Sequence, residues 1–286
     1  MRPQDSSETL SRDRLNPVVF YSSVIGIVVF SLWTMVATEQ ANSIINAILG
    51  WIANTFGWYY FLTVVIYLVF VIGLGLSRFG KIRLGPEHAR PDFNIFSWAA
   101  MLFSAGIGIG VIFFALAEPL TQFYNAPNAP EDEIAAARHA MKITFLHWGL
   151  SGWGIYTLVG MSLAFFSYRH NLPLTIRSSL YPVFGDRIYG TIGHVVDTAA
   201  VLGTVFGIAA SLGIGIIQLN FGLDYMFGIP ESVWTQAVLV LCIVLFATIS
   251  AVTGVERGIR RLSEFNILLA VALLLFVLFA GKTIFL

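Results

Sequence analysis

The chain has 286 residues, of which 57% are hydrophobic, 14% aromatic and only 11% charged. A soluble domain carries about 25% charged residues, so this composition excludes an ordinary soluble enzyme. Sixteen basic and sixteen acidic residues cancel, which leaves no overall positive field to attract nucleic acid. The single cysteine, Cys242, lies in an apolar run and excludes both an internal disulfide and a Cys-x-x-Cys metal site.

Seven apolar stretches predict membrane-spanning helices, because about 18 apolar residues suffice to cross the hydrocarbon core. A segment in lipid must satisfy its own backbone hydrogen bonds, so the expected fold class is an all-α integral membrane protein. The first stretch is longer than the apolar part of a signal peptide and is expected to be retained. The predicted spans are roughly Pro17–Ala37, Gly57–Gly75, Phe96–Ala117, Ile143–Phe166, Ile192–Leu219, Val233–Thr253 and Phe265–Ala280.

The distribution of Lys and Arg predicts an N-terminus in the cytoplasm, since cytoplasmic loops are enriched in these residues. With seven spans, 13 of the 16 basic residues fall on the side of the N-terminus. Only Arg138, Lys142 and Lys282 fall on the other side. The alternation supports both the number of spans and a cytoplasmic tail at residues 1–16. The segments around Glu39 and Asp224 are expected to be external loops without basic residues.

The third predicted span contains three alternate glycines, in the sequence Ser104-Ala105-Gly106-Ile107-Gly108-Ile109-Gly110. Each glycine costs about 1 kcal/mol of helix propensity relative to alanine. One interpretation is close helix packing through the small residues Ser104 and Gly108. The other is a discontinuous helix whose free backbone groups face a binding cavity at mid-membrane, as in many secondary transporters. The two interpretations are compatible.

The fourth predicted span carries Trp148, Trp153 and Tyr156. In a continuous helix, at about 100° per residue, these side chains fan across one half of the surface. Trp148 alone is compatible with an interfacial aromatic belt, and all three are compatible with plain packing. Trp153 lies near mid-span, where a belt does not reach. A quaternary ammonium group has no hydrogen-bond donor and is held by aromatic rings, each worth about 0.5–2 kcal/mol when desolvated.

Ionisable residues within predicted spans are candidates for function. Glu118 closes the third span, where a headgroup-level carboxylate is the simpler interpretation. Glu264 follows a basic cluster and is expected to pair with it. His194 and Asp197 are three residues apart and predict a pair on one helix face. No His-Glu-x-x-His, Gly-x-Ser-x-Gly or P-loop pattern is present, so the sequence predicts neither an enzyme nor a cofactor or metal site.

Several longer blocks resemble the betaine/choline/carnitine transporter family over essentially the whole chain. They are GIGIG followed by VIFFALAEP, then HWGLSGWGIY, SYRHNLPLTIRSSLYPVFGDRIYG and GVERGIRRLSEFN. The blocks NPVVFYSS, FGWYYFL, SRFGKIRLGPE and SWAAMLF look closest to the BetT-type choline transporters of bacteria. The glycine run and the Trp-x4-Trp-x2-Tyr spacing occur together, which makes the resemblance specific.

The resemblance implies a twelve-helix protein with two extra N-terminal helices, two inverted five-helix repeats of the LeuT type, and trimeric assembly. Residues 17–94 would then hold the two peripheral helices and a cytoplasmic loop, and residues 95–286 the first repeat. The sequence stops at Leu286, at the end of an apolar stretch. We therefore expect the chain to be the N-terminal part of a longer transporter. The second repeat would belong to the remainder of that transporter.

The family's functional positions carry over residue by residue. Trp148, Trp153 and Tyr156 match the aromatic box for a trimethylammonium group, and Gly106, Ile107, Gly108, Ile109 and Gly110 match the unwound glycine segment. Thr204 matches the first of two threonine positions at a sodium site in the sodium-coupled betaine members, and Thr204 and Ser104 are both weak candidates for ion coupling. The second threonine of the sodium site in sodium-coupled betaine members falls on Ile208, which offers no oxygen to a hard cation. That departure favours the proton-coupled branch.

The resemblance leaves the substrate open between glycine betaine and choline. Choline-specific members have an aspartate where this chain has Gly110, and a carboxylate suits the uncompensated charge of choline in a desolvated site. Gly110 favours a zwitterion such as glycine betaine, while the overall similarity favours choline. The expected function is secondary active import of quaternary ammonium compounds across the bacterial inner membrane, coupled to protons or sodium, for osmoprotection. The alternatives are a channel-like pore and a non-transporting truncated product.

Overall fold

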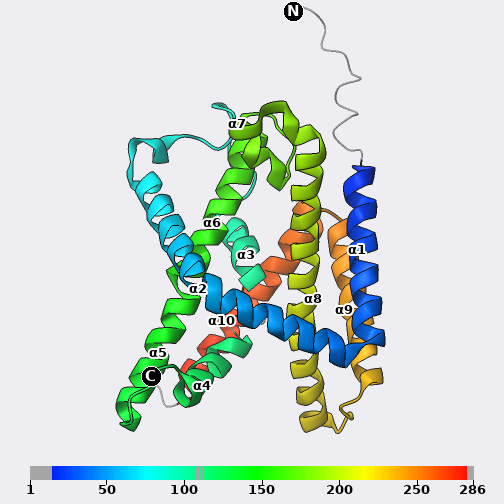
Figure 1. Ribbon diagram of the computed structural model, residues 1–286. Helices are drawn as coiled ribbons and strands as arrows, with labels where there is room; N and C mark the ends of the chain where they lie inside the picture. Colours follow the sequence, from blue (N-terminus) through cyan, green and yellow to red (C-terminus); the bar gives the residue numbers. More distant parts are fainter. Residues whose placement is uncertain (1–14, 107–109, 111, 282–286) are drawn as a thin grey trace, which may run out of the picture. The chain divides into compact units, whose positions relative to one another are not determined.

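The computed structural model describes residues 15–106, 110 and 112–281, and these are almost entirely helical, with no β-strand among them (Figure 1). Six helical runs are long and apolar enough to cross a membrane, and Ile95–Ser104 forms a shorter apolar helix. Large apolar side chains are exposed along all of these helices. Such a surface suits lipid rather than water. The all-α membrane fold predicted from the sequence is confirmed.

Three of the predicted spans agree closely with helices of the structure. Helix α1 covers Pro17–Val36, α9 covers Val233–Val252 and α10 covers Arg260–Ala280. The Asn16 side chain caps α1 by accepting hydrogen bonds from the backbone N–H groups of Val18 and Val19. Proline at the first helical position, Pro17, adds a preset φ angle to this start.

Two helices are longer than predicted. Helix α2 covers Thr38–Leu76 and begins one residue after α1 ends, so Glu39 lies in its first turn and not in an external loop. The segment before Gly57 contains polar residues but no proline, and polar residues alone do not end a helix. Helix α8 covers Thr191–Phe227 and extends well beyond the predicted end of the fifth span.

The third predicted span is divided in the part of the chain that the structure describes. Helix α3 covers Ile95–Gly106 and α4 covers Phe114–Asn125, with Pro119 inside α4. Between them, Gly110 and the pair Ile112–Phe113 have π-helical backbone geometry. The α-helical geometry over Phe96–Ala117 is therefore interrupted at Gly110, as the interpretation of a discontinuous helix expects. Wide π turns are frequent at functional sites.

The fourth predicted span is also divided, at Gly149. Helix α5 covers Glu133–Trp148, α6 covers Leu150–Ala164, and a π-helical turn at Phe165–Arg169 follows. Gly149 has φ −81° and ψ −140°, which is neither helical nor a regular extended conformation. The prediction that the three aromatic residues share one continuous helix is therefore wrong, because Trp148 lies before this break and the other two lie after it.

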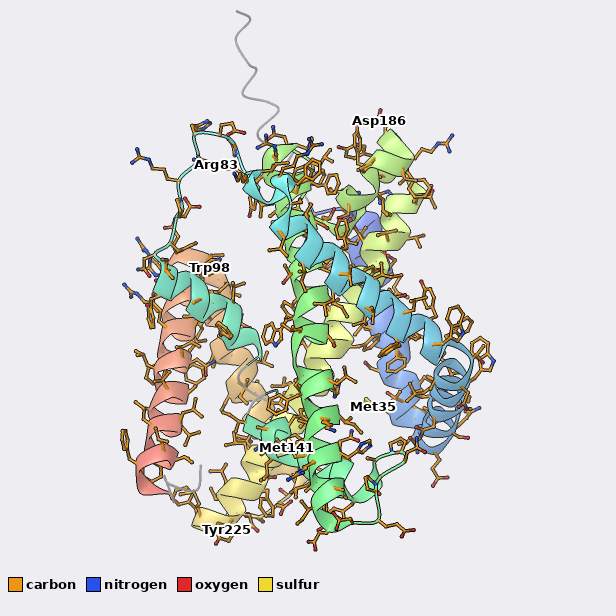
Figure 2. The ribbon with its side chains drawn as sticks, turned by 90° about the vertical axis from the view of Figure 1, so that its left-hand side faces the viewer. Met35, Arg83, Trp98, Met141, Asp186 and Tyr225 are labelled. Atoms are coloured by element: carbon orange, nitrogen blue, oxygen red, sulfur yellow. The ribbon has the colours of Figure 1, made fainter. Side chains whose placement is uncertain are left out.

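The chain forms two compact units. The first contains Met1–Ala89 and Phe145–Phe206, and the second contains Arg90–Thr144 and Gly207–Leu286. Helix α8 contributes its N-terminal part to the first unit and its C-terminal part to the second. In the first unit α2 packs on α6, and in the second α3 packs on α10. Arg83 marks the segment that follows α2 in Figure 2.

Within the first unit, α1 lies beside the N-terminal part of α8 (Figure 1). The contacting residues on α8 recur every four positions, so they form one face of the helix. Polar pairs occupy the start of this seam and apolar contacts its end. The pairs are Asn16 with His194 at 3.1 Å, Ser22 with Thr198 at 2.9 Å, Gly26 with Leu202, and Phe30 with Phe206.

A buried ion pair fastens the short helices that precede α8 to α8 itself. The Arg177 Nε lies 3.2 Å from Asp197 Oδ2, and the Arg177 backbone N–H donates to Asp197 Oδ1 at 3.1 Å. The side chains are only 12% and 9% exposed. The predicted pair of His194 with Asp197 is therefore wrong, since each residue bonds to a partner far away in the sequence: His194 to Asn16, Asp197 to Arg177.

Asp197→Ala is expected to destabilise the full-length protein by about 3–5 kcal/mol, because it leaves the buried Arg177 guanidinium without its counter-ion. The measurement is the apparent melting temperature of purified protein in detergent. Glu87→Ala is the matched control, since Arg169 and Glu87 form an ion pair at 3.0 Å with side chains 32% and 78% exposed. Exposed pairs contribute only about 0–1 kcal/mol. Equal shifts for the two variants would contradict the assignment of Arg177–Asp197 as a structural tie.

Candidate functional site

Three aromatic side chains lie on the two sides of the helix break at Gly149. Trp148 is the last residue of α5, while Trp153 and Tyr156 are in α6. The ring centroids of Trp153 and Tyr156 are 5.9 Å apart with their planes inclined by 50°. The residues are 39%, 41% and 62% exposed in the order Trp148, Trp153, Tyr156. All three residues are therefore partly exposed.

Gly149 is required by the geometry of the break. A Cβ atom added to it would lie 2.3 Å from the carbonyl oxygen of Phe145, far inside van der Waals contact. That carbonyl accepts a hydrogen bond from the Gly149 N–H at 2.9 Å, which closes the last turn of α5. The Trp148 ring then packs on His147, with centroids 5.1 Å apart. The absence of a side chain at Gly149 lets α5 end directly before α6 begins.

A second glycine fixes the position of α6 against α2. Gly154 is buried, and a Cβ added to it would lie 3.1 Å from the Leu68 Cδ1 and 3.5 Å from the Leu68 Cα. Tyr156 follows two residues later, about 200° around the helix. The glycine face of α6 therefore packs on α2, and the Tyr156 ring points away from that contact. Small residues of this kind allow close helix approach in membranes.

The glycine segment is only partly described. Gly106 is the last residue of α3, and Gly110 is a half-buried residue with π-helical geometry. Ile107, Gly108 and Ile109 lie outside the described residues. The non-α geometry at Gly110 agrees with the interpretation of a discontinuous helix.

The two candidate ion-coupling residues have engaged hydroxyl groups. The Ser104 hydroxyl donates to the Met101 carbonyl at 3.2 Å and lies 3.0 Å from the Ser263 hydroxyl of α10. The Thr204 hydroxyl donates to the Ala200 carbonyl at 2.8 Å and is exposed. Each hydroxyl oxygen retains a lone pair, so either can still accept a bond or ligate a cation. Ile208, one turn after Thr204, is 61% exposed and apolar.

A cavity of about 1180 Å³ lies within the first unit, between α1, the N-terminal part of α8 and the segment around residues 167–177. Thr204 lines it, together with Asp197, Ser23 and Thr175. The hydroxyls of Ser23 and Thr175 are buried and have no hydrogen-bond partner in the structure. Neither residue is among the candidates predicted from the sequence. A serine inside an otherwise apolar span, as at Ser23, was the available signal.

No group of three or more His, Cys, Asp or Glu side chains gathers in a metal-binding arrangement among the described residues. Cys242 is free and exposed on α9.

Comparison with known proteins gives the family. Residues 18–286 match the profile of the betaine/carnitine/choline (BCCT) family transporters. The chain belongs to this family. The match covers both units and all the candidate positions, and the aromatic residues of α5 and α6 are therefore those of a BCCT protein. The resemblance predicted from the sequence is confirmed.

Characterised relatives of this BCCT chain include transporters of choline and of glycine betaine. The osmo-dependent choline transporter BetT2 of Acinetobacter baylyi is 52% identical over 285 residues, which is 100% of this chain and 42% of that protein. The high-affinity choline transport protein of Escherichia coli is 54% identical over 282 residues, 99% of this chain and 42% of that protein. A glycine betaine transporter of A. baylyi is 43% identical over 98% of this chain and 43% of its own length. The chain thus spans about two fifths of these relatives.

Gly154→Leu is expected to lower the apparent melting temperature of the full-length protein, because the added side chain meets Leu68 and overpacking costs about 1–3 kcal/mol. The control is Gly160→Leu, since a Cβ added at Gly160 of the same helix meets nothing within 4 Å. The control substitution is expected to be neutral or stabilising, because leucine favours helix by nearly 1 kcal/mol over glycine. If both variants melt together, Gly154 does not determine how α6 packs on α2.

Proposed function

We propose that the full-length protein is a secondary active transporter that imports quaternary ammonium compounds across the bacterial inner membrane. Its substrates are glycine betaine, choline or both, and the import serves osmoprotection. The observation that carries the proposal is the set of partly exposed rings of Trp148, Trp153 and Tyr156 around the break at Gly149. Family membership and the activities printed for the relatives support it.

The aromatic rings suit a trimethylammonium group for an electrostatic reason. This group carries a positive charge but no N–H donor, so hydrogen-bond acceptors and carboxylates alone cannot orient it. The faces of indole and phenol rings present negative potential and attract such a cation by about 0.5–2 kcal/mol each. The ring centroids of Trp153 and Tyr156 are 5.9 Å apart and their planes are inclined to each other. The two rings can therefore contact one trimethylammonium group from different directions.

Proton coupling is the better-supported form of energy supply. A sodium site needs several oxygen ligands, and hard cations do not bind aliphatic side chains. Thr204 provides one hydroxyl on α8, but Ile208, one turn later, provides none. Ser104 offers a further hydroxyl oxygen, which already contacts Ser263. We therefore propose that import depends on the proton gradient.

The residue at Gly110 favours glycine betaine as the substrate, whereas the overall sequence similarity to relatives favours choline. Gly110 has no side chain to balance the charge of choline, whereas glycine betaine brings its own carboxylate. Two relatives with more than 50% identity are named as choline transporters, while the glycine betaine transporter is 43% identical. Both substrates must therefore be compared in one assay.

The proposed assembly is a homotrimer of twelve-helix chains with the N-terminus in the cytoplasm. In it, residues 17–94 form two peripheral helices with a cytoplasmic loop, and residues 95–286 form the first inverted repeat. The second repeat would complete the binding site. Rocking of one repeat against the other provides alternating access without a cofactor.

Uptake of labelled glycine betaine and choline tests the proposal. The full-length gene is expressed in cells without their own uptake systems, in sodium medium and in potassium medium. Saturable, sodium-independent accumulation against a gradient, abolished by a protonophore, is expected. Non-saturable equilibration of the substrate would favour the channel-like pore, and absence of uptake by a correctly inserted protein would favour the non-transporting product. Strict sodium dependence would contradict the role assigned to Ile208.

Trp153→Ala is expected to raise the apparent KM at least tenfold, because the loss of about 1.4 kcal/mol of binding suffices for that. The matched control is Trp234→Ala, which removes an indole that is 83% exposed at the start of α9. Surface amounts of both variants are measured to normalise uptake. An unchanged KM in a correctly inserted Trp153→Ala protein would remove this indole from the binding site.

Gly110→Asp is expected to shift the ratio of choline to glycine betaine uptake toward choline. The added carboxylate balances the choline charge and repels the betaine carboxylate across a desolvated site. Gly110→Asn has the same size without the charge and separates electrostatics from volume. If Asp and Asn variants show the same ratio, charge at position 110 does not set the preference.

A further inference from the structure

Helix α3 carries a stripe of small residues where it packs on α10 in the second unit. Ser97 and Ala100 are buried, at 2% and 1% exposure, and Ser104 is half-buried one turn further on. On α10, Ser263 is buried at 5% exposure. Small residues at this spacing let two helices approach closely in a membrane. Figure 2 shows α3, marked by Trp98, crossing beside the first part of α10.

Two side-chain hydrogen bonds join these helices across the close contact. The Ser97 hydroxyl donates to Glu264 Oε1 at 2.5 Å, and the Ser104 and Ser263 hydroxyls are 3.0 Å apart. Because the Ser104 hydroxyl already donates to the Met101 carbonyl, the Ser263 hydroxyl is the donor in the second pair. Each bond spans about 160 residues of sequence, so both are tertiary contacts.

The two bonds hold α3 at both of its ends. The Asn94 side chain caps the start of α3 by accepting from the Ser97 backbone N–H at 2.8 Å, and Glu264 binds the Ser97 side chain in the same turn. Ser104 lies two residues before Gly106, where α3 ends. Two attachment points seven residues apart fix both the axial position and the rotation of a short helix.

Glu264 contacts both Ser97 and Arg260, and its contact with Ser97 is the shorter of the two. Arg260 Nε lies 3.8 Å from Glu264 Oε1, beyond hydrogen-bond distance, and its side chain is 36% exposed. This ion pair confirms that Glu264 pairs with the basic cluster, although the distance between the two atoms is long for an ion pair. Arg261 and the exposed Glu256 and Arg257 are the other charged residues in and just before α10, and α3 itself has no ionisable residue. The hydrogen bond, not the charge pair, therefore defines where α3 sits.

We propose that Glu264 and Ser263 are positioning residues for the glycine segment. By holding Ser97 and Ser104, they fix the helix that leads into Gly106–Gly110 and so keep the substrate site in its binding-competent arrangement. This inference rests on the proposed function for its transport readout.

Loss of either attachment is expected to raise KM rather than lower the maximal rate. If Glu264→Ala or Ser97→Ala reduces the binding-competent fraction about fivefold, the apparent KM rises by the same factor. Glu264→Gln is expected to keep a near wild-type KM, because its amide oxygen still accepts from Ser97. The double variant Ser97→Ala/Glu264→Ala is expected to resemble the single ones. Glu256→Ala, at an exposed glutamate just before α10, is the control.

A glutamine variant as impaired as the alanine variant would overturn the proposal, because the charge would then matter and not the hydrogen bond. A KM unchanged in Ser97→Ala and Glu264→Ala would overturn it as well. A loss confined to the amount of inserted protein, with KM unchanged, counts as the same result, since it indicates a merely structural role.

A second measurement decides the contact independently of transport. Purified full-length protein is melted in detergent as wild type, Ser97→Ala, Glu264→Ala and the double variant. Residues in contact give non-additive effects, so the double variant is expected to melt with the more affected single variant. Additive decreases would overturn the α3–α10 attachment. If the wild-type protein transports neither substrate, the proposed function fails, and this cycle still tests whether Glu264 holds α3.

Discussion

A backbone N–H or C=O group in lipid has no water to bond with, and this constraint determines where the chain is able to depart from a helix. The described residues comply almost everywhere by remaining helical. The departures at Gly149 and Gly110 are therefore costly, and glycine is the residue that both positions share. At Gly149 the cost is limited because its N–H still bonds to the Phe145 carbonyl. Such a break persists only where neighbouring residues hold the two helices in place.

The neighbours that hold these breaks are contacts between helices far apart in sequence. Gly154 on Leu68 fixes α6 against α2 close to the break at Gly149. Ser104 on Ser263 fixes α3 against α10 close to the glycine segment. In both cases a small residue permits close approach. Gly154 lies five residues after Gly149, and Ser104 lies six residues before Gly110. Side-chain packing thus supplies the rigidity that the interrupted helix itself has lost.

The sequence predicts the helical class, the family and most of the helices, because apolar runs bounded by polar residues have a simple physical cause. It predicts α1 and α9 to within a residue at each end. It misses the first part of α2, since polar residues there lower the mean hydropathy without opposing helix formation. It also misses the break after Trp148, because an isolated glycine is common in membrane helices. Only the position of the Phe145 carbonyl shows that no side chain fits at Gly149.

The side chains to which candidate residues bond were harder to predict than the candidate residues themselves. The spacing of His194 and Asp197 suggests that they bond to each other, but a buried charge is stabilised by its nearest opposite charge, and the fold brings Arg177 to Asp197. His194 instead bonds to Asn16 at the start of α1. Local spacing records which residues share a face. It carries no information on what another segment, 178 residues away in this pair, places opposite that face.

The polar contacts between helices fall into two groups, one within each compact unit. Arg177 with Asp197 and the α1–α8 seam tie elements within the first unit, while Ser97, Ser104, Ser263 and Glu264 tie elements within the second. The aromatic rings belong to the first unit and the glycine segment to the second. Each part of the proposed binding site is thus held by bonds inside its own unit.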